Sequence, residues 1–297
     1  MYRPDAQALE QKLVELSAIE MVAALGVKTE RPAVRRMLRW PFWTASRRVG
    51  KTLAQFDLDA GSEGLPDAAT RALERFDVRL AVSGECPSKG PVVIISNHPG
   101  AYDALALMSA CRRADMMVIA ADNAFVRALP RVSRHLILVP GHTAERAVVL
   151  RRAYSHLAHG GALLQFAAGC IEPDPDFLDG GLAPIRAWEG GTVALARAAA
   201  RVSGQIVIAG VCGVHSPTAK RLVVTRWAER RGITTLAPLV QIVGRYTDVT
   251  VRVAFGLPRP AAALAAAHDD AQILEQLREL MLIRFQEAVP IKPVSEA

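Results

Sequence analysis

Two hydrophobic periodicities alternate along the chain. Apolar residues recur every three or four positions from residue 7 to residue 25, which predicts an amphipathic helix. From about residue 78, short apolar runs predict strands at 78–84, 92–97, 116–121, 135–140, 161–169, 205–214, 221–227 and 248–256. Helical patterns separate or follow these runs at 102–113, 123–132, 143–160, 188–204, 234–246 and 268–288, and we expect an alanine-rich linker at 260–268.

This alternation predicts an α/β fold with a mostly parallel central sheet flanked by helices. The run at 161–169 is apolar throughout, as expected of a strand that is covered on both faces. We expect two regions, namely a helical N-terminal region at 1–75 and an α/β domain at 76–297. Ligand sites of such sheets lie beyond the carboxyl ends of the strands, which is where His98 and Gly169 fall.

Composition and charge narrow the class of protein. With 51% hydrophobic residues among 297, the chain can bury a sizeable core. Its formal net charge is +7 and its cations are mostly arginine, which favours anionic partners without choosing among nucleic acid, lipid head groups and phosphorylated metabolites. The four cysteines are far apart, which argues against a disulfide framework or a zinc ribbon and suits a reducing compartment.

Any membrane contact is expected to be peripheral. The N-terminus has no apolar signal segment, and nowhere do eighteen apolar residues run without a charge. The segment 30–51 interleaves arginines with Trp40, Phe42 and Trp43, a composition that suits the membrane–water interface. The alternative is a helix whose aromatic residues dock on the domain and whose arginines are solvated.

The stretch NHPGAYD, at 97–103, carries the candidate chemistry. His98 leaves a strand, and Asp103 follows in the first turn of a helix, so the carboxylate can hold one imidazole tautomer and leave Nε2 free as a base. Gly100 lets the backbone turn and approach a ligand closely. The alternative is that Asp103 caps the helix and His98 is an ordinary loop residue.

The surrounding sequence resembles the glycerophospholipid (lysophosphatidate-type) acyltransferase family. The first block of that family, which ends in H-x-x-x-x-D, is similar to VSGECPSKGPVVIISNHPGAYD at 82–103. A second block is similar to GGALLQFAAGC and aligns Gly161, Phe166 and Gly169. A third resemblance is found in the helix–strand pattern at 185–211, and together the blocks extend over 78–256.

The resemblance implies transfer of a fatty acyl group from acyl-coenzyme A or acyl carrier protein to a hydroxyl, with His98 as general base and Asp103 orienting it. It implies no metal and no cofactor beyond the acyl donor. The substrate-binding candidates come from the turn, from the second block and from the loops near it. They are Asn97, Gly100, Phe166, Gly169, Glu172 and Arg146.

The second block departs from the family pattern. FAAGCI at 166–171 stands where the family has F-P-E-G-T-R, so the arginine that the family uses around a phosphate is missing. We therefore expect a neutral, zwitterionic or amino-acid-bearing lipid hydroxyl as acceptor. Glu172 and Asp174 are either acceptor ligands or part of a solvated acidic loop. Cys170 is either an acylated nucleophile or a small buried cysteine.

The leading hypothesis is an O-acyltransferase that is cytoplasmic and peripheral on the inner face of a bacterial-type membrane. The alternative is a catalytically silent lipid-binding relative that lost its acceptor site. A nucleic-acid binder is not expected, because the basic and aromatic residues gather only at 31–51. His156 and His159 are expected to be surface histidines of a helix, since no further ligand residue lies at metal-binding spacing.

Overall fold

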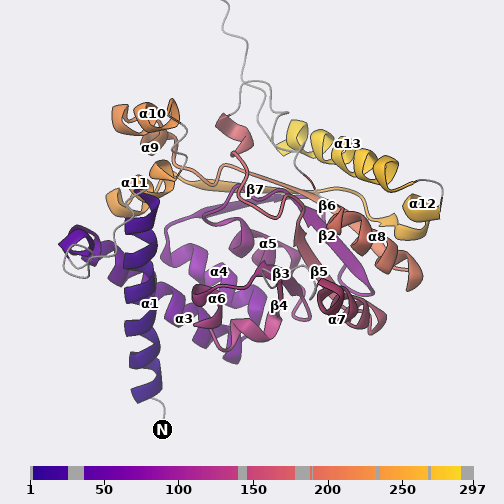
Figure 1. Cartoon of the computed structure of the whole chain (residues 1–297), viewed down its shortest axis with the longest axis horizontal. Helices are drawn as coiled ribbons and strands as arrows, with labels where there is room; N and C mark the ends of the chain where they lie inside the picture. The colour runs from indigo at the N-terminus through magenta and orange to yellow at the C-terminus, as the bar shows by residue number, and fades with distance from the viewer. Residues whose placement is uncertain are drawn as a thin grey trace, which may run out of the picture. The chain divides into compact units, whose positions relative to one another are not determined.

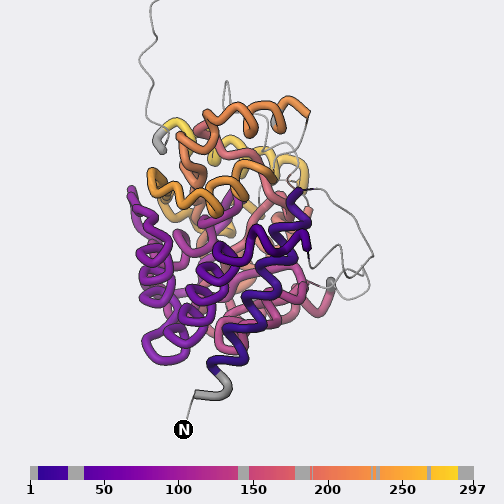
Figure 2. The backbone as a smooth tube through the Cα atoms, turned by 90° about the vertical axis from the view of Figure 1, so that its left-hand side faces the viewer, coloured from indigo at the N-terminus to yellow at the C-terminus, as the bar shows by residue number. Residues whose placement is uncertain are grey.

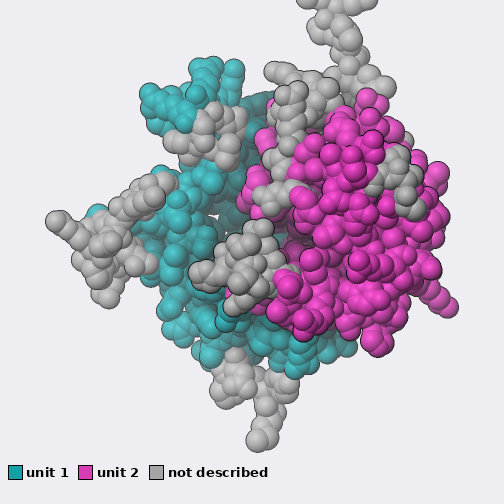
Figure 3. Space-filling view, turned by 45° about the vertical axis from the view of Figure 1, so that its right-hand side comes forward, with its two compact units in different colours: residues 1–79, 123–134, 215–250 teal, residues 80–122, 135–214, 251–297 magenta. Residues whose placement is uncertain are grey.

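The computed structural model of the protein describes residues 3–25, 37–139, 146–177, 188, 190–231, 235–266 and 269–288. The chain forms two compact units, each made of several segments (Figure 3). Unit 1 comprises residues 1–79, 123–134 and 215–250, and unit 2 comprises 80–122, 135–214 and 251–297.

An eight-stranded sheet organises unit 2 (Figure 1). Its strands are β1 (Arg79–Ser83), β2 (Val92–Ser96), β3 (Met117–Ala121), β4 (Leu136–Val139), β5 (Ala162–Phe166), β6 (Gln205–Cys212), β7 (Thr250–Phe255) and β8 (Arg259–Pro260). They lie in the order β1-β7-β6-β2-β5-β3-β4, with β8 paired to β6. β2, β3, β4, β5 and β6 pair in parallel, and β7 and β8 run antiparallel to β6. The predicted α/β fold with a mostly parallel sheet is confirmed.

Helices cover the sheet and build the core of unit 2. They are α5 (Asp103–Cys111), α7 (Arg146–Ala158), the short η4 (Pro175–Phe177), α8 (Gly191–Arg201), α12 (Ala261–Ala266) and α13 (Asp270–Ala288). The sheet side chains Val93, Ile95 and Ile206 belong to one buried cluster with residues of α7, α8 and α13. Every residue of β2 is buried, which is expected of a central strand covered on both faces.

Unit 1 is helical. Its elements are α1 (Arg3–Ala24), η1 (Trp40–Phe42), α3 (Trp43–Ser62), α4 (Leu65–Arg75), α6 (Ala124–Arg127), α9 (Pro217–Arg221), α10 (Val223–Glu229) and α11 (Leu236–Gly244), and η2 (Val132–His135) begins in it. α1 lies along α3 (Figure 2). Gly50 permits this approach, because a Cβ there would lie 2.6 Å from the backbone nitrogen of Val14. Among the described helices, none combines the length and apolar character needed to cross a bilayer.

Two predicted elements are wrong. Residues 221–227 form the end of α9 and most of α10 instead of a strand, because burial there follows a helical spacing: Thr225 and Ala228 are buried while Val223 and Val224 are exposed. The predicted linker at 260–268 contains α12, as the high helix propensity of alanine favours.

One further expectation, about the cysteines, differs from the structure. Cys86 and Cys111 form a disulfide, with Cα atoms 5.1 Å apart, so the sequence spacing of the cysteines misled the expectation against disulfide bonding. The compact units are discontinuous, since residues 123–134 and 215–250 group with the N-terminal helices. The division into an N-terminal region at 1–75 and an α/β domain at 76–297 stays a prediction.

Candidate active site

The end of strand β2 is fixed by the side chain of Asn97. Its Nδ2 donates to the carbonyl oxygen of Val211 in β6 at 2.8 Å, and its Oδ1 accepts the N–H of Val211 at 2.8 Å. Asn97 is buried, and its amide extends the pairing of β2 with β6 by imitating a backbone. In the structure, the Asn97 amide holds the start of the turn. A contact of Asn97 with substrate stays a prediction.

The turn after Asn97 needs a glycine. Gly100 has φ +84°, a conformation that side chains disfavour, and a Cβ there would lie 3.3 Å from Cγ2 of Ile171. Its N–H donates to Oδ2 of Asp103 at 2.7 Å, while Oδ1 of Asp103 accepts the N–H of Ala104 at 2.6 Å. The turn therefore holds the carboxylate in one orientation at the start of α5.

His98 and Asp103 form a hydrogen-bonded pair. Nδ1 of His98 lies 2.7 Å from Oδ2 of Asp103. Because a carboxylate only accepts hydrogen bonds, the neutral imidazole carries its proton on Nδ1 and keeps the lone pair of Nε2. The Asp103 side chain is buried, whereas the His98 side chain is 27% exposed, so the imidazole is the member of the pair that solvent reaches. The ring of Phe166, at the end of β5, stacks on the imidazole with centroids 4.2 Å apart.

Glu172, which lies just past the second block, holds the backbone of His98. Its Oε2 accepts the N–H of His98 at 2.7 Å, and its own N–H donates to the carbonyl oxygen of His98 at 2.7 Å. Its Oε1 accepts the indole N–H of Trp188 at 3.2 Å. The expectation of a solvated acidic loop is therefore wrong, since both Glu172 and Asp174 are buried. The predicted role of Glu172 as an acceptor ligand stays a prediction.

Burial and neighbouring charges shift the pKa values of Glu172 and His98. Burial raises the pKa of Glu172 to about 7, although the hydrogen bonds from His98 and Trp188 lower it. Burial lowers the pKa of His98, but the hydrogen bond and charge of Asp103 and the charge of Glu172 outweigh it, so the pKa of His98 lies above its ordinary value of 6.5. The imidazole is thus a stronger base than free histidine, and it is neutral only at a correspondingly higher pH.

The loop after β5 brings its residues to the end of β2. The N–H of Ala167 donates to the carbonyl oxygen of Ser96 at 2.9 Å, and Gly169 turns the chain with φ +64°. Oδ1 of Asp174 accepts the N–H of Gly213 at 2.9 Å, which ties the loop to the end of β6. The expectation of a buried Cys170 is wrong, because that side chain is exposed and its thiol is free.

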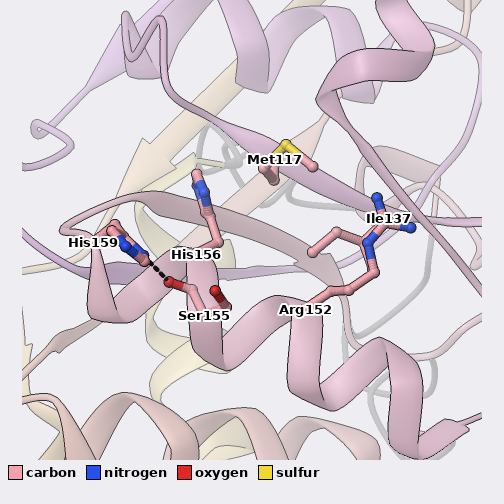
Figure 4. Close-up of a pocket in the computed structure, with 6 residues that line it drawn as sticks. All are labelled: Met117, Ile137, Arg152, Ser155, His156 and His159. Atoms are coloured by element: carbon pink, nitrogen blue, oxygen red, sulfur yellow. Dashed lines mark hydrogen bonds between the residues drawn. The ribbon is translucent and has the colours of Figure 1, made fainter.

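Other candidates lie elsewhere. Arg146 begins α7, but its side chain lies outside the described residues. A cavity of about 330 Å³ is lined by Met117, Ile137, Arg152, Ser155, His156 and His159 (Figure 4). None of the predicted substrate-binding residues lines it. His156 lies on α7 and His159 directly after it, as expected of histidines on a helix.

Trp188 is the site residue that sequence reasoning missed. It lies sixteen residues from Glu172 along the chain, and its indole is buried beside the carboxylate. No local spacing in the sequence signals this contact. The expectation that the site uses no metal and no cofactor stays a prediction.

Comparison with known proteins places the site within a recognised segment. Among solved structures, the chain is similar to the crystal structure of the 1-acyl-sn-glycerophosphate (LPA) acyltransferase PlsC from Thermotoga maritima, with a TM-score of 0.46, 14% sequence identity and coverage of 97% of this chain and 98% of that chain. No curated protein sequence matches. Residues 78–212 match the family model described as Acyltransferase. This match confirms the predicted resemblance, and the segment that contains His98, Asp103 and Glu172 is similar to the acyltransferase family.

Proposed function

We propose that the protein is an O-acyltransferase that moves a fatty acyl group from an acyl thioester to the hydroxyl of a lipid. The observation that carries the proposal is the 2.7 Å contact between Nδ1 of His98 and Oδ2 of Asp103, within the segment that matches the Acyltransferase family model. A buried carboxylate that fixes the imidazole tautomer suits general-base catalysis on a hydroxyl.

In the proposed reaction, Nε2 of His98 removes the proton of the acceptor hydroxyl. The oxygen attacks the thioester carbonyl, and a carbon–oxygen bond forms as the carbon–sulfur bond breaks. The imidazolium returns its proton to the departing thiolate, which leaves as a thiol. Asp103 stabilises the transient imidazolium through its hydrogen bond to Nδ1, and Glu172 adds a nearby negative charge when it is ionised.

The charges near His98 support an acceptor without a phosphate monoester. The acidic residues Asp103, Glu172 and Asp174 are all buried near the turn or in the loop after β5. The stretch 166–171 contains no cation. Arg252 is ion-paired with Asp176 after the same loop, so a doubly charged phosphate would meet mostly negative charge among the described residues there. We therefore infer a neutral, zwitterionic or amino-acid-bearing lyso-lipid, with acyl-coenzyme A or acyl carrier protein as donor.

The N-terminal helices support a peripheral position on the inner face of a membrane. Trp40 and Trp43 are exposed, Trp40 by 82% of its surface, and Arg47 and Lys51 are exposed on the same helical segment. Indole rings favour the head-group layer, and cations near them meet lipid phosphates. Such a contact would bring the enzyme to the membrane in which a lipid substrate resides.

The proposal is tested with His98→Ala in an assay of acyl transfer to lyso-lipids from acyl-coenzyme A and from acyl-loaded carrier protein. We expect the loss of at least about a hundredfold in kcat, which is typical of removing a general base. Cys170→Ser is the matched control, because it removes the exposed thiol that a covalent mechanism would need, and it should leave kcat unchanged. Undiminished turnover by His98→Ala would refute the proposal.

The alternative is a lipid-binding protein without catalysis, which the altered FAAGCI stretch favours. It predicts that the wild-type protein binds lyso-lipids but transfers no acyl group from either donor. Turnover that depends on His98 would exclude it.

A further inference from the structure

Helix α10 of unit 1 exposes an apolar face. Val223 is exposed by 84% of its surface, Val224 by 51% and Trp227 by 48%. The opposite side of the helix is used in packing, since Thr225 and Ala228 are buried. We call the exposed residues the α10 face. They are Val223, Val224, Arg226 and Trp227 of the helix, with Arg230 and Arg231, which directly follow it.

Cations surround this apolar surface, so the expectation that basic and aromatic residues gather only at 31–51 is wrong. Residues 220–231 contain five cations and one acidic residue. The guanidinium of Arg231 lies over the ring of Trp227, 4.1 Å from its centroid. Arg226 and Arg230 are four residues apart and both exposed, so they lie on the same side of the helix. The surface therefore combines protruding apolar groups with a positive field.

Helix α10 packs against α11, through which it joins the other helices of unit 1. Leu236 and Ile242 of α11, the helix that follows α10, pack in one cluster with Met21 of α1 and Phe42 of η1. A guanidinium nitrogen of Arg48 in α3 donates to the carbonyl oxygen of Ile242. Unit 1 therefore carries both the α10 face and the Trp40–Trp43 segment on one set of packed helices.

We propose that the α10 face binds the surface of a membrane rich in anionic phospholipid. A stable protein partner needs roughly 800 Å² on each side, which is large for one short helix that exposes three apolar side chains. Membrane binding needs only a few apolar side chains in the head-group layer and cations at the phosphates, and tryptophan with arginine suits that layer. The inference rests on the proposed function only for its membrane location, and it adds a second contact region besides the N-terminal segment.

The test is the binding of the full chain to sedimented vesicles without acyl donor or acceptor. Vesicles of phosphatidylglycerol with phosphatidylcholine are compared with vesicles of phosphatidylcholine alone. Val223→Asn with Trp227→Ala should weaken binding to the anionic vesicles on the order of tenfold. Arg226→Gln with Arg230→Gln should weaken it by about fivefold for each guanidinium removed, and only for the anionic vesicles.

Leu257→Asn is the matched control, because Leu257 of unit 2 is exposed by the same 84% as Val223. Its binding should stay within about twofold of the wild type. Circular dichroism establishes that each variant is folded. Wild-type binding by both α10 variants, or an equal loss in the control, overturns the proposal.

A carrier-protein dock is the competing role of this surface. If the α10 variants bind vesicles normally but lose transfer from carrier-protein donors alone, the membrane proposal is overturned. Because vesicle binding is measured without a reaction, its result is independent of acyl transfer. An inactive wild-type protein that binds vesicles through α10 would therefore fault the proposed function and leave this inference standing.

Discussion

Two hydrogen bonds join Glu172 to the backbone of His98. The N–H of His98 donates to Oε2 of Glu172 at 2.7 Å, and the N–H of Glu172 donates to the carbonyl oxygen of His98 at 2.7 Å. The pair joins the loop after β5 to the turn after β2, two segments that are 74 residues apart in sequence. Glu172 is therefore a positioning residue for the base, and its charge also acts on the imidazole.

Glu172→Gln separates the positioning of His98 from the effect of the Glu172 charge on the imidazole. The neutral amide no longer raises the pKa of His98, so the acid limb of kcat/KM should move to lower pH. Because the carboxylate accepts from both His98 and Trp188, an amide leaves one buried donor facing its NH₂ group, at a cost of about 1–3 kcal/mol in the free energy of unfolding. The measurement is a pH–rate profile together with denaturant unfolding.

Glu85→Gln is the control, since Glu85 is exposed on the loop that precedes β2. It should leave both the profile and the stability unchanged. A Glu172→Gln enzyme that is slower at every pH, with its acid limb unmoved, would reduce Glu172 to a purely structural role.

The wild-type enzyme should gain activity as pH rises through the pKa of His98. The base must be neutral, and the pKa of His98 lies above 6.5, so kcat/KM should still be rising at pH 7. A profile that is flat above pH 6 would contradict the raised pKa. In His98→Ala the remaining activity should lose this limb.

Stability should fall over the same range of pH. The pKa values of His98 and Glu172 are both raised in the folded protein, to about 7 for Glu172, so the folded state binds more protons than the unfolded chain. Proton binding to His98 and Glu172 therefore favours the folded state at low pH, and this contribution is lost as pH rises through their raised pKa values. We expect the free energy of unfolding to fall by about 1–3 kcal/mol from pH 5 to pH 8 through these groups. Glu172→Gln should show a smaller fall when unfolding is measured at several pH values.

The sequence predicted the parts of the site that are local. His98 and Asp103 lie five residues apart, and a strand–turn–helix pattern is enough to bring them together. The role of Glu172 was missed because its partners, His98 and Trp188, lie on segments distant in sequence. The burial of Asp174 and the exposure of Cys170 likewise depend on how the loop after β5 folds over the sheet.

The difference between local pattern and distant contacts also explains which elements of the fold were predicted. The strands from β2 to β6 were predicted because each is a short apolar run, and a buried parallel strand needs little else. Residues 221–227 misled the prediction, since Val223, Val224 and Thr225 are β-branched and favour strands. In the structure Val223 and Val224 lie exposed on a helix, where tertiary packing of Thr225 and Ala228 decides the conformation.

Asn97→Ala should destabilise the protein more than an ordinary polar truncation. It leaves the N–H and the carbonyl of Val211 unpaired in the core, which costs about 2–4 kcal/mol in the free energy of unfolding. Asn123→Ala is a fair comparison, because Asn123 caps α6 with two hydrogen bonds at an exposed position, and its loss should cost about 1 kcal/mol. Equal losses in the free energy of unfolding for the two variants would show that the Asn97 contacts with Val211 stabilise the protein no more than an exposed helix cap. A changed KM at unchanged stability would instead support its predicted contact with substrate.

Gly100→Ala should damage the geometry of the His98–Asp103 pair. A Cβ at this position meets Cγ2 of Ile171 at 3.3 Å, and φ +84° is strained for any residue with a side chain. Because the N–H of Gly100 donates to the same Oδ2 that holds His98, relief of the strain moves the carboxylate away from the imidazole. We expect a loss of about 1–3 kcal/mol in stability and a fall in kcat of roughly tenfold or more, with KM little changed.

Gly90→Ala is the matched control, since Gly90 also has a positive φ, of +81°, but open space around the added Cβ. It should lose similar stability and keep its kcat. An equal fall in kcat for both variants would show that the turn at Gly100 has no specific effect on the His98–Asp103 pair.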